Sequence, residues 1–347
     1  MLPRGACLRW LFACTCLPVV AGSLLGCSRA DLYPVTRNDP ANSTDSGNTA
    51  SGNTASGNTD SGGADPGSTG SENTATGTEG GEPSPCTAPV QEPGDSNRSV
   101  VVDGRTRTYV LHLPPSYEGL EPVPLVVDFH GVGGSGMNQR STSPYPDVLD
   151  PDGVVMAFPD GLRGPAGTAW NVGPCCVADV DDVAFARALV LDVQASACID
   201  PSRIYAVGVL TGGGMAHHLG CEAADLFAAV APAAFDLLAE TVDDCTPSRP
   251  ITVISFRGTT STRVPYEGGP SSLVPGMPLT FLGAQGTFEA WGSIDGCVGP
   301  ASAPDAAGCS AYSGCRDGAE VILCTQPGGE EPGDPSVAWP VLKRHQL

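Results

Sequence analysis

The sequence predicts an α/β protein with a mostly parallel sheet of about eight strands and helices on both faces. Short continuous runs of Val, Ile, Leu and Phe recur through the second two-thirds of the chain, which is typical of strands buried on both faces. Segments with helical spacing of apolar residues separate several of these runs. Strands that alternate with helices indicate a parallel sheet, because parallel strands need long crossover connections.

The first two strands are predicted over residues 98–102 and 106–113. They flank Asp103-Gly104, a dipeptide that favours the tight turn of an antiparallel hairpin. Six later apolar runs predict the parallel strands. They cover residues 124–129, 153–158, 203–210, 228–233, 251–256 and 320–325.

Three helices are predicted between these strands. The first begins after Asp181, where Asp181 and Asp182 place negative charge at the positive end of the helix. Its apolar residues at 183, 186, 189 and 193 share one face. The other two cover residues 213–223 and 287–294.

Composition argues against several functions. The 347 residues include 38 Asp and Glu against 17 Lys and Arg, a net charge of −21, so no nucleic-acid partner is expected. The 14 cysteines show no paired C-x-x-C spacing, and none lies with histidine at metal-ligand spacing. An oxidising, exported setting therefore explains them better than a metal site.

The first 26 residues predict a signal peptide. Arg4 and Arg9 precede a short apolar stretch over residues 10–22, and Leu24-Leu25-Gly26-Cys27 resembles a bacterial lipobox. The resemblance implies cleavage before Cys27, acylation of its thiol and an envelope protein whose partner is a membrane. The alternative is an ordinary signal peptide that leaves Cys27 unmodified.

Residues 27–95 predict a flexible linker, and residues 96–347 the folded domain. The pentapeptide Ser46-Gly47-Asn48-Thr49-Ala50 recurs from Ser51 and, with a changed last residue, from Ser56. Apolar side chains are nearly absent here, so little can offset the entropy of ordering the backbone.

The strand over 203–210 passes through Gly208-Val209-Leu210-Thr211-Gly212-Gly213 directly into a helix, the layout of a nucleophile elbow. Further motifs follow in order: Arg107-Thr108-Tyr109, Phe158-Pro159-Asp160-Gly161, Trp170-Asn171, Cys175-Cys176, Gly258-Thr259, Val264-Pro265-Tyr266 and Trp339-Pro340. The chain thereby resembles the secreted polyhydroxybutyrate depolymerase and feruloyl esterase-like branch of the α/β-hydrolases over nearly all of residues 98–340. This resemblance implies an α/β-hydrolase fold.

The family's catalytic serine, aspartate and histidine correspond here to Leu210, Ser261 and Val337. Leucine carries no lone pair and cannot attack an acyl carbon. A triad works as one unit, so the loss of all three groups predicts severe impairment. Thr211 follows the turn and would supply a backbone N–H.

The segment His130-Gly131-Val132-Gly133-Gly134 matches the family's oxyanion loop. The resemblance implies that the backbone N–H groups of Val132 and Thr211 are its donors, and backbone donors survive side-chain replacement. The alternative is that the loop persists because the fold needs its turn. Residues 131–136 also match G-x-G-x-x-G, but Pro144 and Pro146 argue against a following helix, so no dinucleotide or other cofactor is expected.

Aromatic residues are predicted to line a cleft for sugar or aromatic groups. The candidates, together with His130, are Trp170, Tyr266, Trp291 and Trp339. Core packing is the alternative role for each of them taken alone.

Ten cysteines follow the leader and Cys27, which allows up to five disulfides: residues 86, 175, 176, 198, 221, 245, 297, 309, 315 and 324. The resemblance implies a pair between Cys297 and Cys315.

Two functions remain open. The first is a lipid-anchored pseudo-hydrolase that binds a polymer, glycan or ester, or contacts another envelope protein. The second is an active carboxylic-ester hydrolase with a non-standard constellation.

Overall fold

The computed structural model describes residue 86 and residues 91–274 and 276–347. The predicted signal peptide, Cys27 and nearly all of the predicted linker lie outside the described residues. No helix within the described ranges is long and apolar enough to cross a membrane.

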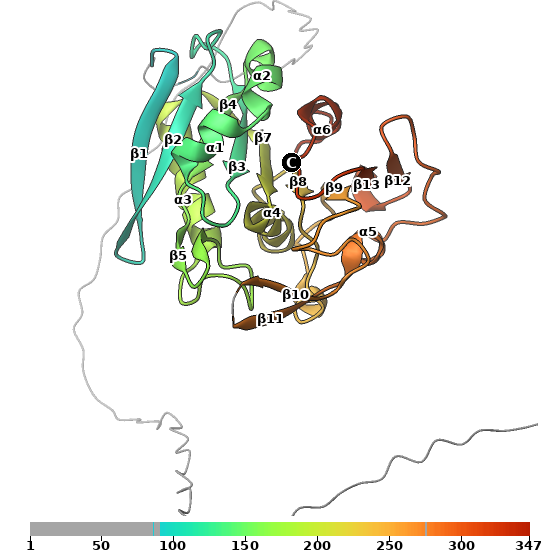
Figure 1. Cartoon of the computed structure of the whole chain (residues 1–347). Helices are drawn as coiled ribbons and strands as arrows, with labels where there is room; N and C mark the ends of the chain where they lie inside the picture. The colour runs from blue at the N-terminus through green and yellow to red at the C-terminus, as the bar shows by residue number, and fades with distance from the viewer. Residues whose placement is uncertain (1–85, 87–90, 275) are drawn as a thin grey trace, which may run out of the picture. The chain divides into compact units, whose positions relative to one another are not determined.

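A nine-stranded sheet organises the domain, in the order β1-β2-β4-β3-β7-β8-β9-β13-β12 (Figure 1). Its strands are β1 (Gly94–Val102), β2 (Arg105–Leu113), β3 (Val123–Phe129), β4 (Val155–Pro159), β7 (Ile199–Val209), β8 (Ala229–Ala233), β9 (Thr252–Gly258), β12 (Cys309–Tyr312) and β13 (Val321–Gln326). The six strands from β4 to β13 are parallel, and β1, β2 and β12 are antiparallel to their neighbours. The predicted mostly parallel sheet is confirmed.

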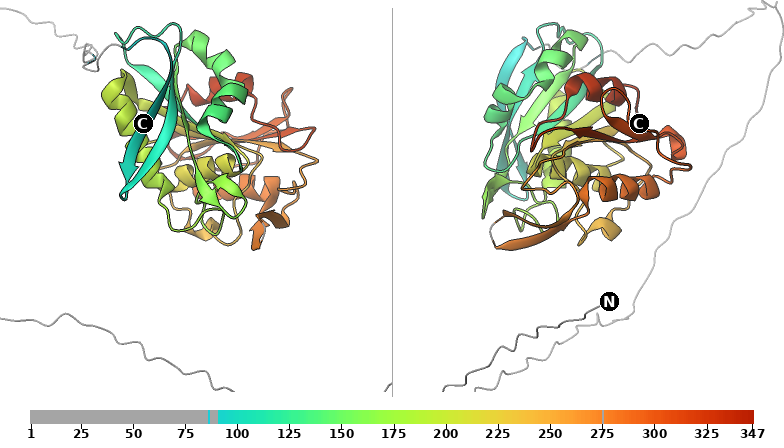
Figure 2. Two further views of the ribbon diagram at one scale, coloured as in Figure 1. Left: turned by 60° about the vertical axis from the view of Figure 1, so that its left-hand side comes forward. Right: turned by 45° about the vertical axis from the view of Figure 1, so that its right-hand side comes forward.

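The ninth strand, β12, was not expected from the sequence. It has only four residues and is half-buried along most of its length, so it lacks the apolar run that marks the other strands. It pairs with β13 in a register that places Cys309 opposite Cys324, and a disulfide joins these two residues. The strand forms one edge of the sheet, and the β1–β2 hairpin lies at the opposite edge (Figure 2).

Helices cover both faces of the sheet. The helices are α1 (Gly136–Thr142), α2 (Tyr145–Leu149), α3 (Asp182–Ser196), α4 (Thr211–Glu222), α5 (Gly283–Ile294) and α6 (Pro335–Leu342). Side chains of α3, α4 and α5 join one apolar cluster, and side chains of α2 and α6 join a second. Strand residues alternate between the clusters, with Val126 in one and its neighbours Leu125 and Val127 in the other, so the clusters lie on opposite faces.

Helix α1 corrects one expectation. Pro144 and Pro146 argued against a helix after the glycine-rich loop, yet α1 begins at Gly136 with Ser135 as its N-cap. It ends at Thr142, before the first proline, so a short helix fits where a long one does not. Smaller elements complete the domain: β5 (Leu162–Gly164), β6 (Gly167–Ala169), β10 (Gly269–Val274), β11 (Met277–Phe281), η1 (Asp150–Asp152), η2 (Val242–Asp244) and η3 (Arg316–Gly318).

Five disulfides link the ten cysteines, as the even count predicted. They are Cys86–Cys198, Cys175–Cys176, Cys221–Cys245, Cys297–Cys315 and Cys309–Cys324. The pair between Cys297 and Cys315 that the resemblance implied is confirmed. The bridge from Cys86 attaches the chain ahead of β1 to the connection between α3 and β7.

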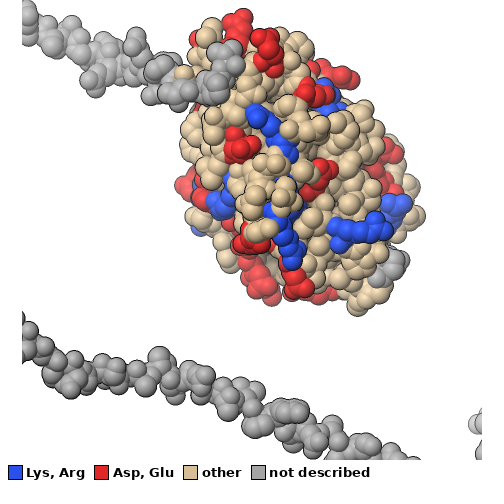
Figure 3. All heavy atoms as spheres, turned by 90° about the vertical axis from the view of Figure 1, so that its left-hand side faces the viewer, with Lys and Arg blue, Asp and Glu red and all other residues tan. Residues whose placement is uncertain are grey.

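Charged side chains of both signs are interspersed on the face that carries β1 and β2 (Figure 3). This face offers no continuous basic surface.

Candidate functional site

The sharp turn at Leu210 joins β7 to α4. Leu210 has φ 52° and ψ −123°, a conformation that costs a residue with a side chain about 1–3 kcal/mol. Its N–H donates to the Ala233 carbonyl (3.0 Å), and its own carbonyl accepts from the Gly214 N–H (2.9 Å). Glycine at residue 212 permits this geometry, because a Cβ there would lie 1.9 Å from the Phe129 carbonyl oxygen. The elbow layout is therefore present, with leucine at its tip.

The Leu210 side chain packs against the loop that follows β3. A Cβ placed on Gly131 would lie 3.3 Å from Leu210 Cβ and 3.4 Å from Leu210 Cδ1. The half-buried apolar side chain thus lies beside the predicted oxyanion loop. No atom of it can act as a nucleophile or a base.

Hydrogen bonds fix the shape of that loop. The Gly133 N–H donates to the Thr168 carbonyl (2.7 Å), and the Gly134 N–H donates to the Gly131 carbonyl (3.0 Å). The N–H groups of Val132 and Thr211 donate to no partner in the described part of the chain. Thr211 is fully buried and Val132 is half-buried, and the role of their N–H groups as oxyanion donors stays a prediction.

His130 holds this loop in place and does not serve as a base. Its Nε2 accepts the Gly161 N–H (2.9 Å), so that nitrogen carries no proton. Its Nδ1–H then donates to the Gly131 carbonyl (2.7 Å), and burial lowers the pKa of the ring. Trp170 packs on this ring and donates its indole N–H to the His130 carbonyl (2.8 Å). With both nitrogens engaged, the imidazole is a structural support.

Ser261 lies in the connection after β9 and contacts a carboxylate that the sequence did not single out. Its hydroxyl donates to Glu330 Oε1 (3.1 Å), which also accepts the N–H groups of Thr262 (3.1 Å) and Arg263 (2.9 Å). Burial raises the pKa of Glu330, but these donors outweigh it and hold that pKa below its usual value. The chain therefore places a carboxylate beside Ser261 from the loop between β13 and α6. In the sequence, the Gly328-Gly329 pair after the last predicted strand is the feature that indicates a loop here.

Val337 has no polar side chain and makes no hydrogen bond to this group. It belongs to the first turn of α6 and packs against the cluster on the α2 and α6 face of the sheet. Glu330 is thus the ionisable side chain that contacts Ser261.

The predicted aromatic residues do not meet in one cleft. Trp170 and Trp291 are fully buried in the cluster on the α3, α4 and α5 face, whereas Trp339 is buried on the opposite face and donates to Asp152 Oδ2 (2.6 Å). Tyr266 is half-buried, and its hydroxyl pairs with Thr325 Oγ1 (2.7 Å). The expectation of a shared aromatic cleft is wrong, because a sequence pattern does not reveal which face of the sheet a ring covers.

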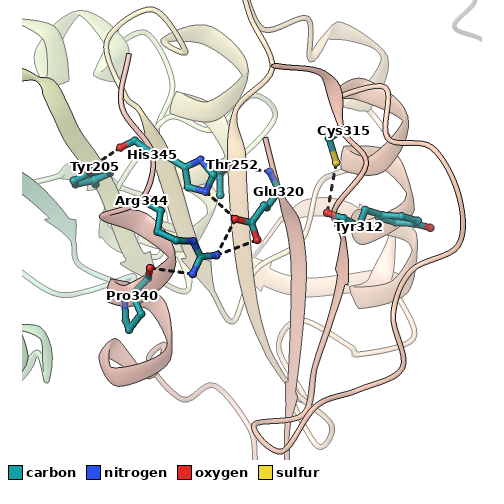
Figure 4. Close-up of polar contacts among 8 residues, drawn as sticks. All are labelled: Tyr205, Thr252, Tyr312, Cys315, Glu320, Pro340, Arg344 and His345. Atoms are coloured by element: carbon teal, nitrogen blue, oxygen red, sulfur yellow. Dashed lines mark hydrogen bonds and ion pairs between the residues drawn. The ribbon is translucent and has the colours of Figure 1, made fainter. Parts of the chain in front are cut away.

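None of the chain's five histidines is placed as a base at Leu210. His130 supports the loop, and His217 and His218 lie two helical turns along α4. His112 contacts Asp95 (2.6 Å) and Asp150 (3.0 Å). His345 contacts Glu320 (3.1 Å) just before β13 begins (Figure 4). Because β13 and β7 run in parallel, Glu320 before β13 and Leu210 after β7 lie at opposite ends of the strands.

Comparison with known proteins adds sequence relatives. The chain is 42% identical to "Feruloyl esterase B" of Piromyces equi over 245 residues, which is 70% of this chain and 46% of that protein. It is 36% identical to "Putative esterase NocK" of Nocardia uniformis subsp. tsuyamanensis over 185 residues, 52% of each. The chain thus spans about half the length of these relatives. No family model matches the chain.

A solved structure supports the fold. The acetyl xylan esterase from Aspergillus awamori superposes with a TM-score of 0.52 at 14% identity, covering 72% of this chain and 99% of that one. At this identity the likeness concerns the fold alone. The five disulfides agree with an extracellular setting. The mostly parallel sheet and the elbow turn after β7 show an α/β-hydrolase fold, and the sequence relatives support a relationship to the esterases with that fold.

Proposed function

We propose that this chain is an exported member of the esterase family that binds an ester, polymer or glycan ligand without hydrolysing it at speed. The observation that carries the proposal is Leu210 at the tip of the elbow. Acyl transfer at this turn needs a nucleophile and a base, and the tip carries neither.

The loop after β3 supports a binding role. The N–H groups of Val132 and Thr211 are suited to a carbonyl or carboxylate oxygen, and their geometry does not depend on side-chain identity. Leu210 adds apolar contact beside them. A ligand with an ester or carboxyl group next to an apolar chain matches this combination.

The protein is further proposed to be a lipoprotein of the cell envelope, anchored through Cys27 and held away from the membrane by residues 28–95. The lipobox-like segment before Cys27 and the repeated polar pentapeptides support this proposal. Mass spectrometry of the mature N-terminus tests it directly. A terminal cysteine with added acyl mass is expected, and an unmodified Cys27 would refute the anchor.

An active esterase with a non-standard constellation is the second candidate. The 42% identity to a feruloyl esterase over 245 residues favours it. The chemistry at Leu210 opposes it, because function depends on the reacting groups and not on the fold.

One experiment separates the two candidates. The purified protein is assayed with p-nitrophenyl acetate and butyrate and labelled with a fluorophosphonate. We expect no covalent label and no turnover near the usual enzyme range of about 1–10³ s⁻¹, while ester or carboxylate ligands raise the melting temperature. Labelling of any residue together with such turnover would establish the active esterase instead.

A further inference from the structure

A disulfide fixes where the chain ahead of β1 joins the folded domain. Cys86 is bonded to Cys198, the residue directly before β7, across a sequence separation of 112. Further along the chain, the side-chain amide of Gln91 donates to the Ser196 carbonyl at the end of α3, and its oxygen accepts from Arg98 of β1 (3.1 Å). Cys86 and Gln91 are therefore held beside the start of β7 before the chain reaches the first strand.

The sheet holds Cys198 in place. Its carbonyl accepts the Val123 N–H at the start of β3 (3.0 Å), its own N–H donates to the Tyr117 hydroxyl (2.7 Å), and its side chain is buried. The strand that follows, β7, pairs with β3 on one side and with β8 on the other. A force that enters at Cys86 is therefore passed to a central strand of the sheet.

The elbow lies at the other end of the same strand, because Leu210 directly follows β7 and Cys198 directly precedes it. A pull between these two residues acts along the strands. It loads the hydrogen bonds that join β7 to β3 and to β8 together, and bonds that share a load resist separation better than bonds that are loaded one at a time. The disulfide thus connects the chain ahead of β1 to a mechanically strong path through the domain.

Without the disulfide, the same pull would enter through β1. This strand forms one edge of the sheet, pairs only with β2 within the described residues and is mostly exposed (Figure 1). It lies four strand spacings from β7, about 19 Å, so a pull between Gly94 and the elbow crosses the sheet diagonally and draws Gly94 away from β2. The pairs of β1 would then open one after another, since edge segments with few buried contacts open at low cost.

We propose that the Cys86–Cys198 disulfide is a mechanical clamp, which carries tension between the envelope anchor and a ligand at the elbow along β7 and keeps that tension off β1. The clamp rests on the proposed function, because only a chain that is anchored at one end and bound to a ligand at the other is under such tension. A ligand that diffuses freely exerts none, so the clamp serves an extended or immobile ligand such as a polymer or glycan.

Force spectroscopy on the lipid-free chain tests the clamp without any ligand. One handle is attached through an azide-bearing residue at Thr260, which is exposed after β9 at the elbow end of the strands. The second is either a tether handle at Glu82, ahead of Cys86, or a strand handle at Asn97, which is exposed on β1. All disulfides stay intact in both chains. At equal force, we expect the chain with the tether handle to unfold at least tenfold more slowly than the chain with the strand handle.

Variants assign this difference to the disulfide. Cys86→Ser with Cys198→Ser should make the chain with the tether handle unfold as fast as the chain with the strand handle, with an early extension as β1 detaches. Cys297→Ser with Cys315→Ser is the matched control, because it also removes one disulfide but lies outside the chain between the two handles. It should leave the unfolding rate at equal force within twofold of the unmodified protein.

Two outcomes would overturn the clamp: equal unfolding rates for the tether and strand handles, or an unchanged rate for the tether handle after Cys86→Ser with Cys198→Ser. If that variant fails to fold, the two handle positions in the unmodified protein decide alone. Failure of the proposed function is seen separately, by mass spectrometry of the N-terminus and by the ligand melts. An unmodified Cys27 would remove the source of tension and reject the clamp's role even where the force measurement succeeds.

Discussion

At the scale of single residues, Leu210 shows that the backbone conformation of the elbow is present without the side chain that the reaction requires. Gly208 and Gly212 allow β7, α4 and the end of β3 to approach each other so closely that any Cβ would clash with backbone atoms. This steric requirement holds whichever residue occupies the tip. A leucine can therefore keep the strained turn although it cannot perform the reaction that such strain usually serves.

Replacing Leu210 by serine alone should yield almost no esterase activity. The new hydroxyl would have no imidazole to take its proton, because His130 uses both ring nitrogens and the other histidines lie elsewhere. We expect turnover of p-nitrophenyl butyrate below about 1% of the usual enzyme range. Leu210→Ala is the matched control, and a single serine variant that is far faster than it would contradict this account.

A base should function at residue 330 and not at residue 337. Glu330 contacts Ser261 (3.1 Å), whereas Val337 packs within α6. We therefore expect the variant L210S/S261D/E330H to regain fluorophosphonate labelling above background, and L210S/S261D/V337H to remain unlabelled. Mass spectrometry of the labelled peptides measures both. Preferential labelling of the V337H variant would support the position assigned from the sequence.

At the scale of elements, the C-terminal segment makes contacts at the strand ends opposite the elbow. Arg344 donates to both carboxylate oxygens of Glu320 (2.8 and 3.0 Å), His345 contacts one of them, and the Tyr205 hydroxyl donates to the His345 carbonyl (2.8 Å) (Figure 4). These contacts attach the chain after α6 to β7 and to the start of β13. They concern stability and not the site at Leu210.

Deletion of residues 344–347 should lower the free energy of unfolding by about 1–2 kcal/mol. The lost contacts are one partly exposed ion pair and a few hydrogen bonds, each worth about 1 kcal/mol or less. Urea denaturation measures the change. Glu320→Gln should cost less, because it leaves the Tyr205 contact intact. Ligand binding at the elbow should be unaffected in both variants, and a loss there would show coupling that this structure does not explain.

At the scale of the whole molecule, two buried carboxyl groups favour an acidic optimum of stability. Burial raises the pKa of Asp128 and of Asp295 to about 7. Each folded-state pKa exceeds the unfolded value of about 4. The stability that these carboxyl groups contribute in their neutral form is therefore complete below about pH 4 and is lost as the pH rises towards 7. A second set of carboxylates has lowered pKa values in the folded protein, so the stability that they contribute is lost as the pH falls below about 4. These residues are Asp95, Asp152, Asp200, Asp225 and Glu330.

The melting temperature should accordingly be highest near pH 4–5 and fall towards pH 8. Asp128→Asn should reduce that fall, because an amide mimics the protonated carboxyl and can still pair with Gln139 and Ser143. Asp147→Asn in α2 is the control, since Asp147 is exposed and should leave the slope unchanged. Thermal melts from pH 4 to 8 test both variants. A steeper fall in Asp128→Asn would show that the buried group is ionised in the folded state.

The sequence by itself determined eight of the nine strands of the sheet, the helices α3, α4 and α5, and the absence of a nucleophile at the elbow, because hydrophobic periodicity, glycine geometry and the chemistry of one side chain are local properties. Only the tertiary structure decided that Glu330 reaches Ser261 and that the tryptophans are divided between opposite faces. Those facts depend on strand order and on which elements pack together, which bring residues distant in sequence into contact.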